Sequence, residues 1–109
     1  MTNKRMVQTP FGVFSTKTAI KDYIRVWLYE FEPGDRIEDS DIVAGLVFLI
    51  RQRKSKIAKI GDRQIVGWTI EPNNTGSRCF AAILDDGVQL HFSFPKAVDR
   101  LFESASENA

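Results

Sequence analysis

The feature that most constrains the fold is a β-hairpin predicted between residues 78 and 94. Two strand-like segments, 78–84 and 88–94, flank Asp85-Asp86-Gly87, and glycine tolerates the positive φ angle that tight hairpin turns need. Side chains alternate between the two faces of a strand, so the second segment divides into an apolar and a polar set. The apolar set is Val88, Leu90, Phe92 and Phe94, and the polar set is Gln89, His91 and Ser93. We therefore expect an antiparallel sheet with one face in the core.

Two further segments have strand character. Residues 64–71 are rich in β-branched and aromatic side chains, and a turn-like stretch follows them at 72–77. Residues 11–14 form a short strand or an extended entry to the next element. The sheet is therefore expected to have about three strands, with or without a short extra strand at the N-terminus.

An amphipathic helix is predicted to begin just after Ser15 or Thr16, either of which can cap its exposed amide groups. Apolar residues then recur at helical spacing, which places them on one face. They are Ile20, Tyr23, Ile24, Trp27, Leu28 and Phe31. Pro33-Gly34-Asp35 ends the helix, because proline cannot donate to its hydrogen-bond ladder and glycine favours a turn.

A second helix is predicted to start at Asp39 or Ser40. Its apolar residues cover more than one face, so we expect it to be deeply buried. They are Ile42, Val43, Leu46, Val47, Leu49 and Ile50. The segment Lys54-Ser55-Lys56 that follows is expected to lie in a loop.

Pro95 suits the first turn of a closing helix, whose Val98, Leu101 and Phe102 share one side. The predicted class is thus α+β: two N-terminal helices, a small antiparallel sheet and one C-terminal helix. The 109 residues suit one domain, 1–109, with a core at about residues 11–103. The first few residues and the polar segment 104–109 are expected to be flexible.

Composition excludes several classes of protein. No apolar run approaches the roughly 18 residues that cross a bilayer, and no apolar signal stretch follows Met1. Cys79 and His91 are the only residues of their kinds, which leaves no disulfide framework and no familiar zinc site. We expect a cytoplasmic protein that is not an enzyme and that needs no metal or cofactor.

The near-neutral net charge of +1 conceals two opposite blocks. Residues 30–41 carry Glu30, Glu32, Asp35, Glu38, Asp39 and Asp41, opposed only by Arg36. Residues 51–63 carry Arg51, Arg53, Lys54, Lys56, Lys59 and Arg63, opposed only by Asp62. This distribution predicts a dipolar surface, although the helix dipole by itself also favours acids at the start and bases at the end of a helix.

The basic block is the candidate binding site for nucleic acid, because clustered lysine and arginine release counterions from phosphates. The polar side of the sheet adds Arg78, Gln89 and His91 as candidate contacts. Trp68 and Phe80 would stack on unpaired bases if they were exposed, but strand aromatics of a small domain are more often in the core. We expect Cys79 to be inert packing and His91 to be a surface side chain.

Short motifs in the same order and spacing resemble the DCL-like domain, named for defective chloroplasts and leaves. They are Phe14-Ser15-Thr16-Lys17-Thr18-Ala19, Phe31-Glu32-Pro33-Gly34-Asp35, Lys59-Ile60-Gly61, Ser77-Arg78-Cys79-Phe80, Asp86-Gly87 and Phe92-Ser93-Phe94-Pro95-Lys96. The resemblance covers about residues 11–101. The chain departs from the family at Arg51-Gln52-Arg53-Lys54-Ser55, where a His-Pro step is usual, and at Phe94-Pro95, which replaces Tyr-Arg. Ala97 replaces the family's second cysteine.

Plant members of that family act in plastid ribosomal RNA maturation, so the resemblance implies an RNA-linked, non-catalytic role. The chain looks like a stand-alone bacterial or phage member. We therefore predict a small RNA-associated binding module. The alternatives are a protein-interaction adaptor that docks on a nucleic-acid-handling complex, and a small hydrolase that uses carboxylates with a metal.

Overall fold

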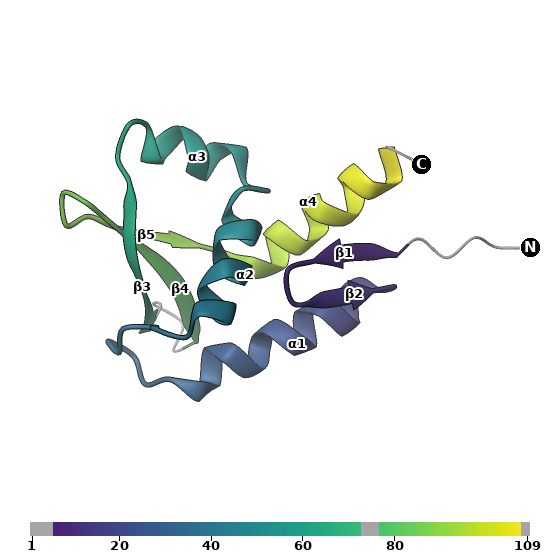
Figure 1. Ribbon diagram of the computed structural model, residues 1–109, viewed down its shortest axis with the longest axis horizontal. Helices are drawn as coiled ribbons and strands as arrows, with labels where there is room; N and C mark the ends of the chain where they lie inside the picture. Colours follow the sequence, from purple (N-terminus) through teal and green to yellow (C-terminus); the bar gives the residue numbers. More distant parts are fainter. Residues whose placement is uncertain (1–5, 73–76, 108–109) are drawn as a thin grey trace, which may run out of the picture.

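The computed structural model describes residues 6–72 and 77–107 and has an α+β architecture (Figure 1). The strands are β1 (Val7–Thr9), β2 (Gly12–Phe14), β3 (Ile65–Pro72), β4 (Arg78–Leu84) and β5 (Gln89–Phe92). The helices are α1 (Lys17–Glu30), α2 (Ser40–Ile50), α3 (Lys54–Ile60) and α4 (Phe94–Glu107). None of the helices in the described ranges is long and apolar enough to cross a membrane.

The predicted hairpin is confirmed as part of an antiparallel sheet in the order β3-β4-β5. Phe80 pairs with Ile70 on one side and with Phe92 on the other, so the three side chains share the face that packs into the core. Helices α1, α2 and α4 lie on one side of this sheet (Figure 1). The strand after the turn is shorter than predicted, because Val88 stays 46% exposed in the turn and Phe94 already begins α4.

The outer edge of β3 is covered by the segment that joins α1 to α2. The Gly34 amide donates to the Ile70 carbonyl at 2.7 Å, and the Ile37 amide donates to the Trp68 carbonyl at 2.9 Å. Arg36 pairs with Thr69 as an isolated bridge between them. This pairing satisfies backbone groups that an edge strand otherwise leaves open.

Helix α1 is capped by Thr16, whose hydroxyl accepts a hydrogen bond from the Ala19 amide at 3.1 Å. Its buried residues are Ile20, Ile24, Trp27 and Leu28, as the spacing predicts. Tyr23 lies at the edge of that face and is 45% exposed. The helix ends at Glu30, three residues before Pro33.

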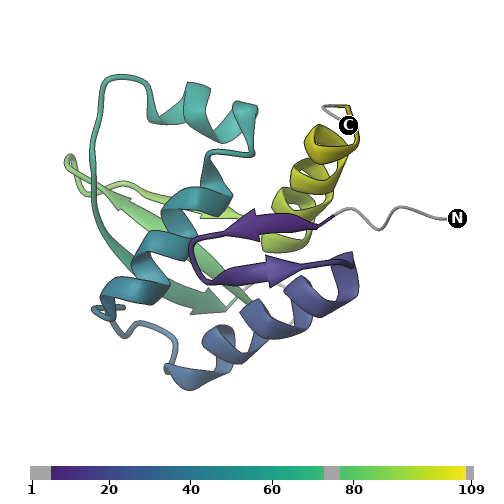
Figure 2. The same ribbon diagram turned by 45° about the vertical axis from the view of Figure 1, so that its right-hand side comes forward.

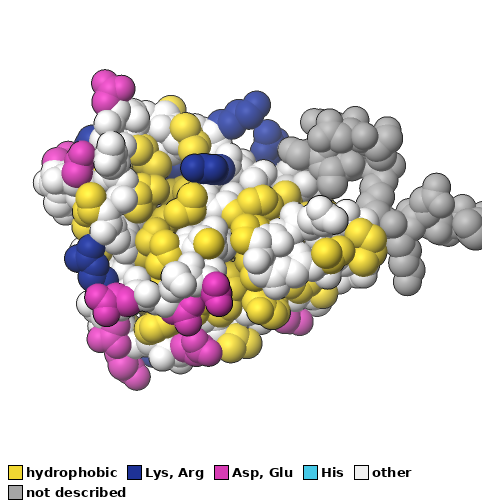
Figure 3. All heavy atoms as spheres, viewed as in Figure 1, with side chains coloured by type: hydrophobic (Ala, Val, Ile, Leu, Met, Phe, Trp, Pro, Cys, Tyr) yellow, Lys and Arg dark blue, Asp and Glu magenta, His cyan; other side chains and the backbone are white. Residues whose placement is uncertain are grey.

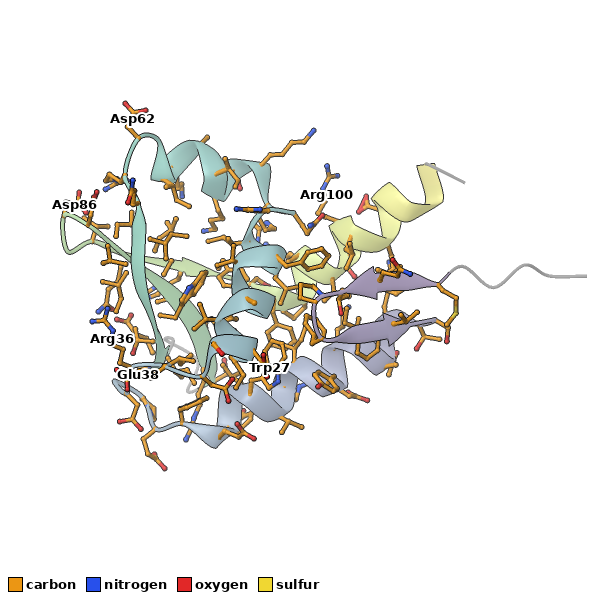
Figure 4. All side chains as sticks on the ribbon, viewed as in Figure 1. Trp27, Arg36, Glu38, Asp62, Asp86 and Arg100 are labelled. Atoms are coloured by element: carbon orange, nitrogen blue, oxygen red, sulfur yellow. The ribbon has the colours of Figure 1, made fainter. Side chains whose placement is uncertain are left out.

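Helix α2 is the central helix and is buried on more than one side, as predicted. It starts after Asp39, whose carboxylate accepts hydrogen bonds from the amides of Asp41 and Ile42. Gly45 faces α1, and a Cβ atom at this position would stand 2.7 Å from Cη2 of Trp27. Figure 4 shows Trp27 projecting from α1 toward α2. The absence of a side chain at residue 45 therefore allows the two helices to approach closely.

The N-terminal strand at residues 11–14 is one half of a hairpin, which the sequence patterns do not predict in full. Strands β1 and β2 pair antiparallel around Pro10 and Phe11, and β2 lies against α1 while β1 lies against α4 (Figure 2). The hairpin is held by aromatic contacts, with the Phe11 ring 4.9 Å from that of Trp27 and stacked on Tyr23 at 5.4 Å.

The expectation of a loop at residues 54–56 is wrong. Residues 54–56 are helical, because the segment Lys54–Ile60 contains neither glycine nor proline and continues until Gly61, which has a φ of 60°. This helix has no fully buried residue, so it lacks the apolar stripe that reveals a helix in a sequence. Helix α4 continues to Glu107, beyond the predicted core boundary at about residue 103. The expectations for residues 1–5, 73–76, and 108 and 109 lie outside the described residues.

The close approach at Gly45 predicts the sign of the change in stability when this glycine is replaced with alanine. In an open helical position, replacing glycine with alanine stabilises a protein by up to about 1 kcal/mol. At this position the new methyl group meets the rings of Trp27 and Phe11, so Gly45→Ala should instead destabilise the fold by about 1–3 kcal/mol through overpacking. Urea denaturation monitored by tryptophan fluorescence measures the change. A stabilising effect would contradict the described packing of α1 against α2.

Candidate nucleic-acid interface

Most of the predicted basic block lies at the turn between α2 and α3 and along α3. Arg51 is the residue at the C-terminal end of α2, and Arg53 immediately precedes α3. Lys54, Lys56 and Lys59 belong to α3 itself. Figure 3 shows blue side chains over the top of the molecule, where α3 lies in the same view.

A further cation joins this group from a distant part of the sequence. Lys96, in the first turn of α4, lines the same hollow as Arg53 and Lys56. Sequence analysis missed Lys96, because only the fold brings the start of α4 beside α3. We call the resulting set the basic surface; it consists of Arg51, Arg53, Lys54, Lys56, Lys59 and Lys96.

The basic surface is not neutralised by the protein's own carboxylates. Within residues 6–72 and 77–107, none of its members forms an ion pair. The cations elsewhere are mostly paired: Lys17 and Lys21 with Asp99, Arg25 with Asp22, and Arg100 with Glu103. The uncompensated positive charge is thus concentrated in one region.

Lys56 lies close enough to three other members of the basic surface for their charges to perturb it. Burial lowers the pKa of Lys56 from its ordinary value, and the positive charges of Lys59, Arg53 and Lys96 lower it further. The charges therefore repel one another in the free protein. A bound polyanion relieves that repulsion, because it supplies the opposite charge that the fold does not.

A hollow of about 280 Å³ lies beside the basic surface. It is lined by Arg53, Lys56, Cys79, His91, Phe92, Ser93 and Lys96. The lining comes from α3, β4, the end of β5 and the start of α4. Within the described residues, Nη1 of Arg53 is buried and has no hydrogen-bond partner, a state that is costly for a buried donor.

The structure places the remaining predicted contacts in different environments. His91 lies at the hollow and pairs through Nε2 with the Glu71 carboxylate of β3. Gln89 is exposed on the same face of β5 but nearer the β4–β5 turn. Arg63 lies past the far end of α3, where it pairs with Asp86 at 2.9 Å and donates to the Ile60 carbonyl. Its charge is therefore largely compensated.

Arg78 makes structural contacts at the end of α1. Its Nη1 donates hydrogen bonds to the carbonyls of Leu28 at 3.3 Å and Phe31 at 2.8 Å. Its guanidinium group lies 4.9 Å from the centre of the Tyr29 ring. These contacts satisfy carbonyl groups that the last turn of a helix leaves without partners, so the side chain is engaged within the fold.

The candidate stacking residues are both in the core. Trp68 is 1% exposed and Phe80 is fully buried, which confirms the expectation that strand aromatics of this chain serve packing. Cys79 is half-buried beside Glu71, with Sγ 3.6 Å from the Glu71 carbonyl. The three-stranded sheet therefore offers no aromatic platform for bases among these residues.

The acidic block lies away from the basic surface, around the end of α1 and the start of α2. Asp39 caps α2, and Asp35 accepts a hydrogen bond from the Glu32 amide. Figure 3 shows magenta side chains at the lower left, with a smaller group at the upper left. Figure 4 places Glu38 in the lower group and Asp62 and Asp86 in the upper one. This distribution is the dipolar surface that the charge pattern predicts.

Within residues 6–72 and 77–107, no group of three histidine, cysteine or acidic side chains is placed so that it could hold a metal ion.

The contacts of Arg78 within the fold predict that this side chain stabilises the protein and does not bind RNA. Arg78→Gln should lower the free energy of unfolding by about 1–3 kcal/mol, since it removes charged hydrogen bonds to two half-buried carbonyls. The RNA affinity of the folded variant should be unchanged. Arg25→Gln is the control, because its exposed ion pair with Asp22 contributes about 0.5 kcal/mol or less. A stable Arg78→Gln protein with weakened RNA binding would contradict this assignment.

The environment of Cys79 predicts slow alkylation. Burial raises the pKa of the thiol, the negative charge of Glu71 raises it further, and Lys56 opposes both. A raised pKa leaves less thiolate, the reactive form, at neutral and mildly alkaline pH. Iodoacetamide should therefore modify the folded chain more slowly than the urea-unfolded chain, and Glu71→Gln should speed the reaction. Equal rates in the folded and unfolded chains would refute this prediction.

Comparisons with known proteins bear on the fold. The chain is similar to an uncharacterized protein from Rhodospirillum rubrum whose solution NMR structure aligns with a TM-score of 0.75 and 24% sequence identity. The alignment covers 89% of this chain and 91% of that protein. No protein-family model and no curated protein matches the chain. What this likeness shows is the shared α+β fold.

Proposed function

We propose that the chain is a small, non-catalytic RNA-binding module that holds the RNA backbone on the basic surface. The observation that carries the proposal is the concentration of cations without carboxylate partners, among the described residues, at the α2–α3 turn, on α3 and at the start of α4. Each phosphate that such a side chain neutralises releases condensed counterions, which favours binding at low salt.

The kinds of side chain present favour backbone contacts over the reading of bases. Arg51 and Arg53 offer planar donors that match phosphate oxygens, and the lysines of α3 add mobile point charges. The sheet aromatics Trp68 and Phe80 are buried and do not take part. We therefore expect binding that depends on salt and varies little with sequence.

The resemblance to the DCL-like domain supports the same proposal. Two of the motifs that carry it, Lys59-Ile60-Gly61 and Phe92-Ser93-Phe94-Pro95-Lys96, border the basic surface in the structure. Plant members of that family act in plastid ribosomal RNA maturation, and a role in RNA processing in a bacterial or phage cytoplasm fits this chain. Assistance of a processing enzyme, with no chemistry of its own, is the activity proposed.

The alternative function is an adaptor that docks on a nucleic-acid-handling complex. The outer face of α1 favours it, because Val26 and Tyr29 are both 59% exposed there beside the acidic end of the helix. Pull-down from nuclease-treated lysate discriminates between the two functions. A stoichiometric protein partner that survives nuclease treatment, together with no binding to RNA at low salt, would replace the RNA-binding proposal with the adaptor.

Neutralisation of the basic surface should weaken RNA binding and its salt dependence. For single-stranded RNA of about ten nucleotides, the double variant Lys54→Gln/Lys59→Gln should raise Kd. It should also flatten the plot of log affinity against log salt by about 0.7 units for each phosphate that the variant no longer neutralises. Fluorescence anisotropy at several salt concentrations measures both effects.

The matched control is Lys17→Gln/Arg25→Gln, which removes the same charge from α1, where both cations have carboxylate partners. Its effect on Kd should be small. Equal weakening by the two double variants would indicate an effect of net charge alone and would overturn the assignment of the basic surface.

A further inference from the structure

We propose that the hollow beside the basic surface is a phosphomonoester site that holds the terminal 5′-phosphate of an RNA strand. The inference rests on the proposed function. Part of the basic surface would bind the 5′-terminal phosphate of the RNA, and the remaining cations would bind the phosphates that follow it. The hollow is bounded by Arg53 and Lys56 on one side and by Ser93 and Lys96 on the other.

The hollow has room for a terminal phosphate group. Its volume of about 280 Å³ is near the lower end of the roughly 300–1,000 Å³ that is typical of small-molecule pockets. An RNA strand held by its terminal phosphate therefore continues outside the hollow. Lys54 and Lys59, which are exposed on α3, are available to phosphates outside the hollow.

The charge of the hollow suits a dianion. Arg53, Lys56 and Lys96 line it without an ion-pair partner in the described part of the chain. A phosphate monoester carries close to two negative charges near pH 7, whereas an internal phosphodiester carries one. The monoester therefore offsets more of the repulsion among these cations.

Arg53 and the start of α4 both border the hollow. The half-buried Arg53 lines it, and planar guanidinium groups match phosphate oxygens closely. The start of α4, whose Ser93 and Lys96 line the hollow, adds the positive end of a long helix dipole. His91 faces the same hollow from β5, where Glu71 of β3 holds it.

The test compares two RNAs of the same sequence, one with a 5′-phosphate and one with a 5′-hydroxyl group, for binding to the full chain. We expect the phosphorylated RNA to bind about tenfold more tightly or better. Arg53→Gln and Lys96→Gln should each reduce that ratio toward one. Lys96 is exposed, so its variant tests the site even if Arg53→Gln fails to fold.

The control variant is Lys54→Gln, in the basic surface but outside the lining of the hollow. It should weaken both RNAs alike and keep their ratio. If the wild-type protein binds both RNAs equally, the phosphomonoester site is refuted while the RNA-binding function stands.

If neither RNA binds, the proposed function is refuted. A titration with uridine 5′-monophosphate then tests whether the hollow still binds a phosphate monoester. Shifts of the Ser93 and Lys96 amide resonances, absent from Lys96→Gln, would support a phosphomonoester site that serves a free nucleotide. No shift at these amides would overturn the site as well.

Discussion

The rest of the structure depends on the burial of α2, which has to hide apolar side chains on more than one face. Leu46 and Leu49 are fully buried, and Gly45 lets the helix lie directly against Trp27 of α1. Between Ile42 and Ile50 the one exposed residue is Ala44, so the helix has little surface on which to place charge. Its charged residues are therefore confined to its two ends, and the ends emerge on different parts of the surface.

That arrangement explains how a chain of nearly neutral net charge presents a strongly basic region. The acids are at the start of α2, where Asp39 caps the helix, and the bases follow its end, where α3 continues them. The fold then brings Lys96 to the same place. Asp86 and Asp99 are engaged by Arg63 and by the lysines of α1, and the Glu71 carboxylate near the hollow pairs with His91. Separation by the fold, rather than net charge, creates a surface that attracts a polyanion.

Sequence reasoning predicted the parts of the fold that have strong periodicity and clear boundaries. The cap at Thr16, the start of α2 at Asp39 and the turn before Gly87 are all local signals. Helix α3 was not predicted, because none of its side chains is fully buried and the sequence therefore shows no apolar stripe there. Of the candidate site, the basic run was predictable from the order of charged residues along the sequence. The hydrogen bonds from Arg78 to α1 and the position of Lys96 beside α3 were not predictable, because each depends on residues that are distant in the sequence.

Amide chemical shifts of the isotopically labelled protein, recorded as single-stranded RNA is added at low salt, show whether RNA binds to the basic surface. We expect the largest changes at residues 51–60, with a second group at residues 91–97, and we expect the changes to fade as salt is added. Changes spread evenly over the surface, or centred on the exposed face of α1 around Val26 and Tyr29, would contradict this expectation.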